Sequence, residues 1–315
     1  MFEILSITGV IFVIIGIGFV SVRGGLFSPD DMRTLGKFVV NLALPALILR
    51  AVSGRSLSEV ANVGYLGAVL FGSLAVFSLG YLWTRRGSGK SAVVSTFGAM
   101  GMSCANSGFV GYPVLLMVLP EVASIALALN MIVENLVMIP LVLIMAEYSR
   151  NTGIAGGKLA QQIAVRLIRN PIVIALLLGL AVSASGITLP KLIERPIDIF
   201  ASASAAVSLA VIGGTLASLP LRSLNASVIS VVIGKLVIHP LAVALGLFLM
   251  TMIGLGVGND QLAAAAVIIA ATPVMAIYPI LAQRYGEDHY ASLAMLVMTA
   301  LSFITISVVL AITTH

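Results

Sequence analysis

Two ionisable side chains, Glu134 and Lys235, lie deep within apolar stretches of the sequence. A charged group near the centre of a bilayer costs at least about 2.5–3.5 kcal/mol, so it needs a partner or a function. Lys235 would attract an anion. Glu134 either carries a proton, because desolvation favours the neutral carboxyl group, or is a permanent ion-pair partner, with Lys235 as the candidate. His239 follows Lys235 by one helical turn and is either a packing residue or a proton relay.

Helix-breaking residues gather in two further apolar stretches, Ser103–Pro113 and Ala271–Pro279. In a helix interior Gly costs about 1 kcal/mol and Pro about 3 kcal/mol relative to Ala, so we expect both helices to be interrupted. Irregular backbone at membrane depth persists only where protein or a water-filled cavity surrounds it. The N-terminus of each half-helix would favour an anion. The alternative is a pair of proline kinks that neighbouring helices repair, without a ligand.

These features together predict a site for a small carboxylate between the two interruptions. Lys235 would either help to bind it or act as a fixed counter-charge that replaces a bound sodium ion, which would argue against sodium coupling. Charge coupling is assigned to Glu134, Lys235 and His239. The candidate substrate-binding residues are Asn41, Asn106, Ser107, Gly108, Gly111, Tyr112, Thr272, Pro273 and Lys235.

The composition is that of an integral membrane protein. Of 315 residues, 60% are apolar and 9% are charged, whereas a soluble domain carries about 25% charged residues. The mean hydropathy is +1.14. The net charge of +5 comes from bases scattered over short loops, so it does not indicate nucleic-acid binding. The lone Cys104 excludes a disulfide framework and a cysteine-based metal cluster.

Ten apolar stretches are long enough to cross a bilayer as helices. The first lacks a basic leader and a cleavage site, so we expect it to be retained rather than to act as a signal peptide. The expected spans are Phe2–Val22, Met32–Val52, Ala61–Trp83, Ser91–Leu119, Val122–Ala146, Ile163–Ser185, Pro196–Ala217, Leu224–Met252, Gln261–Arg284 and His289–Ile312.

The distribution of Lys and Arg predicts the orientation. The odd-numbered loops hold 12 of the 17 basic residues, and the even-numbered loops hold Arg50, Arg55, Lys191 and Arg195. Since basic loops stay in the cytoplasm, both termini are expected on the outer face.

An internal repeat appears at an offset of 166 residues. Tyr112-Pro113 then aligns with Tyr278-Pro279, and Glu121 aligns with Glu287. The fourth and fifth spans thus correspond to the ninth and tenth. Five is an odd number of spans, so the second copy must enter the membrane from the opposite side, as in many secondary transporters. We expect residues 1–150 to form the first repeat and residues 151–315 the second.

Three local patterns resemble the auxin efflux carrier family, which includes plant auxin exporters and bacterial carriers of malonate and other organic acids. They are Asn41-Leu-Ala-Leu-Pro45, Asn106-Ser-Gly-Phe-Val-Gly-Tyr-Pro113 and Lys235-Leu-Val-Ile-His239-Pro240. The resemblance implies an all-α fold similar to sodium/proton antiporters and bile-acid symporters. Spans 1, 2, 6 and 7 would form a scaffold, and spans 3–5 and 8–10 a transport domain in which broken helices 4 and 9 cross. Plant exporters often have a long loop after the fifth span; here it covers only Glu147–Gln162, which favours a bacterial carrier.

The sequence therefore predicts a secondary transporter of a small mono- or dicarboxylate in the bacterial inner membrane, working by alternating access. A channel or a non-transporting sensor is the alternative. An enzyme is not expected, because neither an H-E-x-x-H pair nor a G-x-S-x-G turn occurs. No cofactor or metal is expected. The stripe of small residues at Ser202, Ala206, Ala210 and Gly214 indicates close helix packing, either within the chain or in a homodimer.

Overall fold

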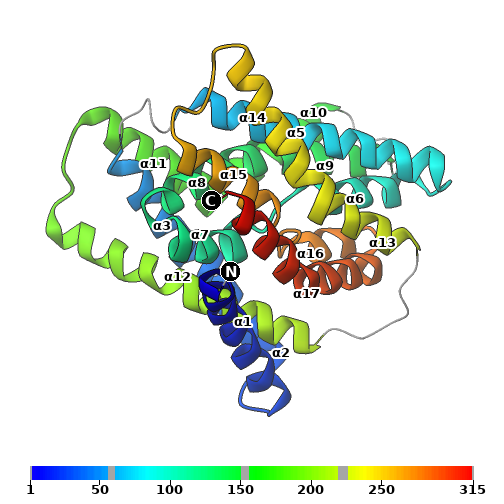
Figure 1. Cartoon of the computed structure of the whole chain (residues 1–315), viewed down its shortest axis with the longest axis horizontal. Helices are drawn as coiled ribbons and strands as arrows, with labels where there is room; N and C mark the ends of the chain where they lie inside the picture. Colours follow the sequence, from blue (N-terminus) through cyan, green and yellow to red (C-terminus); the bar gives the residue numbers. More distant parts are fainter. Residues whose placement is uncertain (1, 56–60, 150–155, 219–225, 314–315) are drawn as a thin grey trace. The chain divides into compact units, whose positions relative to one another are not determined.

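A computed structural model describes residues 2–55, 61–149, 156–218 and 226–313. Helices joined by short turns make up these four ranges, and no strand occurs in them (Figure 1). The boundary expected between the two repeats, at residues 150 and 151, lies outside the described ranges, as does Leu224, the expected start of the eighth span.

The first five expected spans appear as helices, several of which contain one wider π-helical turn (η). Such turns insert an extra residue into a helix and are frequent at functional sites. The elements are α1 (Phe2–Arg23), α2 (Pro29–Phe38), η1 (Val39–Ala43), α3 (Leu44–Ser53), α5 (Val63–Leu82), η2 (Trp83–Gly87), α6 (Ala92–Ser103), η3 (Ser107–Gly111), α7 (Tyr112–Val118), α8 (Pro120–Val133), η4 (Glu134–Met138) and α9 (Ile139–Ser149).

In the second half of the chain, helices lie at the positions of the other five expected spans, and α10 is an additional helix. Its elements are α10 (Gly156–Ile168), α11 (Pro171–Ser185), α12 (Lys191–Ser218), α13 (Ala226–Ile233), η5 (Gly234–Ile238), α14 (His239–Met252), α15 (Asp260–Ala270), α16 (Tyr278–Gln283) and α17 (Asp288–Thr313).

Two of the expected helix starts are wrong. The sixth span was expected to begin at Ile163, but α10 ends at Ile168 and a separate helix begins at Pro171. The side chain of Asn170 accepts a hydrogen bond from the Ile172 N–H, and Pro171 occupies the first helical position, so both residues start a new helix. The seventh span begins at Lys191, five residues before the expected Pro196, which lies within the helix.

Seven helices in the described ranges are long and apolar enough to cross a membrane, and the pair α10–α11 makes an eighth if it is one span. Two further helices, Gly9–Arg23 and Asp260–Ala270, are apolar but shorter. The chain is thus a multi-pass α-helical membrane protein. The described residues form two compact units, which we treat separately.

Unit 1 combines Met1–Asn62, Ser107–Met131 and Ile168–Ser218. Within it α1 lies along α12, and α11 packs on α3 (Figure 1). A Cβ atom added at Gly18 would clash with the Ala210 carbonyl oxygen, and one at Gly214 with Met32 Sδ. Part of the stripe of small residues is therefore used for packing within the chain.

Unit 2 combines Val63–Asn106, Ile132–Leu167 and Leu219–His315. Within it α5 lies along α14 (Figure 1). The two helices approach closely because each has a glycine where it contacts the other. A Cβ at Gly72 of α5 would clash with Val243, and one at Gly246 of α14 would clash with the Ala68 backbone. Lys235 and His239 of the candidate site belong to η5 and α14, and α6 contacts both α5 and η5.

Candidate functional site

The two interruptions expected from the sequence are present. The first helix stops at Ser103, and Cys104–Asn106 is not helical; Cys104 itself has an extended backbone. The second stops at Ala270, and helical structure resumes at Tyr278. After the first break helical structure resumes at Ser107, as η3, and continues into α7, which begins at Tyr112-Pro113; after the second break it resumes directly at Tyr278-Pro279.

The residues that cause the first interruption differ from those expected. Gly108 and Gly111 lie inside the π turn η3, after the break. Pro113 is the second residue of α7, directly after η3, so it also lies after the break. Gly108 is instead required by packing in unit 1, because a Cβ there would lie 2.8 Å from Leu44 Cδ1 and 3.1 Å from Met131 Cε.

The two interrupted segments meet inside unit 2. The main-chain N–H of Asn106 donates to the Pro273 carbonyl oxygen at 2.8 Å and to Thr272 Oγ1 at 3.2 Å. Asn106 and Thr272 are 166 residues apart, which is the repeat offset. All three residues are buried, so this contact fixes the crossing of two irregular segments in the interior.

Lys235 is fully buried beside the second interruption. Its Nζ donates to the Ala270 carbonyl, at the C-terminal end of α15, where a cation is favourable. It also lies 3.0 Å from His239 Nδ1. With Lys235 taken as an ammonium group, which can only donate, Nδ1 is assigned as the acceptor and the proton of the neutral imidazole is assigned to Nε2.

Ser73 completes this buried chain of hydrogen bonds. Its Oγ lies 3.1 Å from His239 Nε2 and accepts the ring proton. Sequence reasoning missed Ser73, although the signal was available: it is 166 residues before His239. The contact between α5 and α14 thus includes two residues separated by the offset of the expected repeat.

Glu134 lies beside the first interruption. Its Oε1 accepts the N–H of Ala105 at 3.0 Å, so a carboxylate satisfies a donor freed by the break. Glu134 attracts Lys235 electrostatically, but in the described ranges the two form no direct ion pair. Glu134 therefore satisfies a main-chain donor at the first interruption, and Lys235 satisfies a main-chain acceptor at the second.

The second interruption also offers main-chain donors. Within the described part of the chain, the N–H groups of Val274, Met275, Ala276 and Ile277 donate no hydrogen bond, and Val274 and Met275 are buried. By contrast, the carbonyl of Ala271 accepts from Thr305 Oγ1. The carbonyl groups of Ala270 and Ala271, at the start of the break, thus accept hydrogen bonds from side chains. The N–H groups of residues 274–277, at its end, remain available to an acceptor.

The remaining candidate residues belong to unit 1. Asn41 has an exposed side chain, and its Nδ2 donates to the Lys37 carbonyl one turn earlier at 2.7 Å. Ser107, Gly111 and Tyr112 are buried in η3 and at the start of α7. The structure thus places Asn106, Thr272, Pro273, Lys235, His239 and Glu134 in one unit and Asn41, Ser107, Gly108, Gly111 and Tyr112 in the other.

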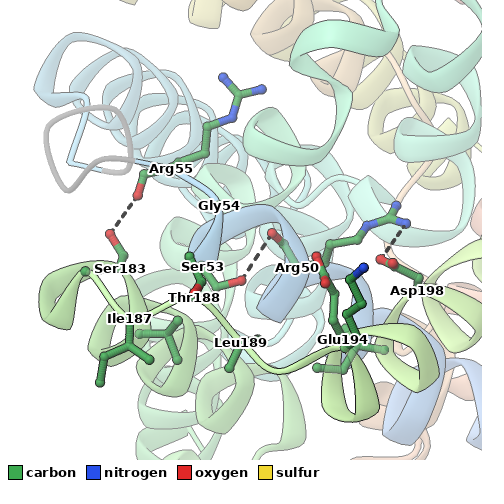
Figure 2. A pocket seen from close by; sticks show the side chains of 14 residues that line it. Arg50, Ser53, Gly54, Arg55, Ser183, Ile187, Thr188, Leu189, Glu194 and Asp198 are labelled. Carbon is green, nitrogen blue, oxygen red and sulfur yellow. Dashed lines mark hydrogen bonds and ion pairs between the residues drawn. The ribbon is translucent and has the colours of Figure 1, made fainter.

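A separate pocket of about 810 Å³ opens in unit 1, and none of the candidate residues lines it. Arg50 and Asp198 form an ion pair there at 3.5 Å. Figure 2 shows Arg50 reaching toward Asp198, whereas the Arg55 guanidinium points away from that pair; it donates to the Glu121 carbonyl. In the described ranges no group of three or more His, Cys, Asp or Glu residues could hold a metal ion.

Comparison with known proteins agrees with a multi-pass α-helical membrane protein. The model of the "Membrane transport protein" family matches residues 8–310, and the chain belongs to this family, the auxin efflux carriers that its motifs resemble. It is 29% identical over 313 residues to the "Putative malonate transporter" of Rhizobium meliloti (strain 1021), covering 98% of this chain and 95% of the relative. It is also 31% identical over 109 residues to an "Uncharacterized transporter" of Methanothermobacter thermautotrophicus, covering 33% and 34% of the two chains.

Proposed function

We propose that this protein is a secondary carrier that moves a small organic anion, such as a dicarboxylate, by alternating access. The observation that carries the proposal is the contact between two interrupted helices, Asn106 to Thr272 and Pro273, with Lys235 buried beside it. Interrupted segments in corresponding halves are the strongest pointer to a transporter's binding site. The similarity to a malonate transporter supports the substrate class.

The anion would be held at the second interruption. The N–H groups of residues 274–277 offer donors without a partner in the described chain, and Lys235 supplies positive charge nearby. Asn106 and Thr272 would position the substrate from the crossing itself. Asn41, Ser107, Gly108, Gly111 and Tyr112 would contribute from unit 1 at one stage of the cycle.

The proposed architecture is ten spans in two inverted repeats. Its support is that Asn106 bonds Thr272 and Ser73 bonds His239, each pair separated by 166 residues. In an arrangement with two-fold symmetry, only residues near the axis touch their own counterparts. The apolar segments Gly9–Arg23, within α1, and Asp260–Ala270, which is α15, would be the spans that length and hydropathy alone do not assign.

The two units support a division into scaffold and transport domain. Unit 1 contains the first, second, sixth and seventh spans, as expected for the scaffold, and unit 2 contains the third, eighth, ninth and tenth. The fourth and fifth spans are shared, because Ser107–Met131 groups with unit 1. Movement of unit 2 relative to unit 1 would expose the site to each side in turn.

Lys235 is proposed to act first as a fixed counter-charge. It is bonded to Ala270 at the C-terminal end of α15, the position where a bound cation would also be favourable. This arrangement favours transport without sodium. Glu134 or the Lys235–His239 pair would then carry a coupling proton, if one is used. We place the protein in the bacterial inner membrane with both termini outside.

Reconstituted vesicles test the proposal. Vesicles loaded with unlabelled malonate should take up labelled malonate by saturable counterflow, and the rate should not change when potassium replaces sodium. Linear flux without saturation would indicate a channel. No flux of any mono- or dicarboxylate, with the protein correctly inserted, would contradict a carrier of organic anions.

A further inference from the structure

The helix α10 is amphipathic, and the protein does not bury it. Lys158, Gln162 and Arg166 follow one another at four-residue spacing and form a polar stripe. Leu159, Ile163 and Leu167 form an apolar stripe beside it, followed by Ala160, Ala164 and Ile168. None of residues 157–168 is buried, and the side chain of Ile168 is 71% exposed.

An apolar helix face that the protein leaves uncovered needs another apolar environment. For a helix with Lys and Arg on its opposite face, that environment is the boundary between headgroups and acyl chains of a bilayer. The chain has no acidic residue between Glu147 and Glu194, so α10 contains no carboxylate of its own to neutralise its bases. These properties point to a membrane surface rich in anionic headgroups.

A second arginine faces α10 within unit 2. Arg284 directly follows α16, and its positive charge acts unfavourably on the partly buried guanidinium of Arg166. In the described ranges neither arginine has a carboxylate in ion-pair contact. The nearby Tyr285 hydroxyl donates to Glu147 Oε1, so this carboxylate is bonded elsewhere. Two like charges held together without a counter-ion fit a bound anion.

We propose that Arg166 and Arg284 bind the phosphate of an anionic phospholipid, with Lys158 adding charge two turns away and the apolar face of α10 contacting the acyl chains. Two guanidinium groups match phosphate geometry because each offers a fork of N–H donors. The site is independent of the carrier proposal, because it lies on the helix before the sixth span and involves none of the substrate-binding candidates.

The test measures lipid binding to the purified full-length protein. Thermal stability is followed in detergent while dioleoyl-phosphatidylglycerol or dioleoyl-phosphatidylcholine is added, and bound lipid is counted by native mass spectrometry. We expect phosphatidylglycerol, and not phosphatidylcholine, to raise the melting temperature and to remain bound. In the double variant R166Q/R284Q both effects should fall at least several-fold.

A matched control removes the same charge elsewhere. The double variant R85Q/R86Q lies at the end of the third span and should keep the wild-type response to phosphatidylglycerol. Inorganic phosphate and glycerol 1-phosphate distinguish a lipid from a soluble anion: either one giving the full stabilisation would overturn the lipid assignment. An equal loss of phosphatidylglycerol binding in both double variants would overturn the site. If R166Q/R284Q does not fold, the single variants R166K and R284K are compared instead. If both retain as much phosphatidylglycerol as the wild type, the need for guanidinium geometry is contradicted.

Discussion

The main-chain N–H of Asn106 donates to the hydroxyl oxygen of Thr272, 166 residues further along the chain. The same hydroxyl donates to the Ile269 carbonyl at 2.7 Å, so it links the last turn of α15 to the other interrupted segment. One side-chain oxygen therefore bridges the two breaks. This places Thr272 at the centre of the proposed crossing.

Thr272→Val should reduce transport at least about tenfold, because it keeps the shape of the side chain but removes a buried hydrogen bond worth about 1–3 kcal/mol. Initial rates of malonate uptake in vesicles, normalised to inserted protein, measure the effect. Thr272→Ser retains the hydroxyl and should transport at close to the wild-type rate. Equal rates for the valine and serine variants would show that the bridge is not needed.

Lys235→Met should abolish transport and lower stability. It leaves the buried Ala270 carbonyl without its donor, and an unsatisfied buried acceptor costs about 1–3 kcal/mol; it also removes the charge that attracts Glu134. The double variant Lys235→Met/Glu134→Gln should recover part of the melting temperature without recovering transport. Wild-type flux in a correctly inserted Lys235→Met protein would exclude Lys235 from the mechanism.

Gly213→Ala should destabilise unit 1 strongly. A Cβ at this position would come within 2.7 Å of the Ile15 carbonyl carbon, on the backbone of α1, which cannot move without separating the helices. We expect a loss of at least about 1–3 kcal/mol, as in overpacked cores. Gly16→Ala is the control on α1, because nothing lies within 4 Å of its added Cβ. Thermal unfolding in detergent should separate the two, and equal melting temperatures would contradict the described packing.

The orientation can be tested with single cysteines, since Cys104 is buried and is the only native cysteine. In a Cys104→Ala background, Lys191→Cys should react with an impermeant maleimide added outside intact cells. Lys158→Cys should react only after the membrane is opened. Both native lysines are exposed, so access should report the side of the membrane. The reverse labelling pattern would place both termini in the cytoplasm.

Local sequence features determined the class of fold and the approximate position of each helix. The apolar runs predicted the helices because a bilayer selects long apolar segments, and the gathered Gly and Pro residues predicted that the fourth and ninth expected spans are interrupted. Glu134 and Lys235 stood out because charges are rare in such segments. The start of the sixth span was missed because apolar residues lie on both sides of Arg169-Asn170-Pro171, where local capping by Asn170 begins a new helix.

Only the tertiary structure decided how the buried charges are satisfied. The sequence left an ion pair between Glu134 and Lys235 open, whereas the structure pairs Glu134 with the Ala105 N–H and Lys235 with Ala270 and His239. Hydropathy and helix breaking are properties of neighbouring residues, so they can be read along the chain. The partner of a buried donor depends on which distant segments fold against it, and here those segments lie up to 166 residues apart.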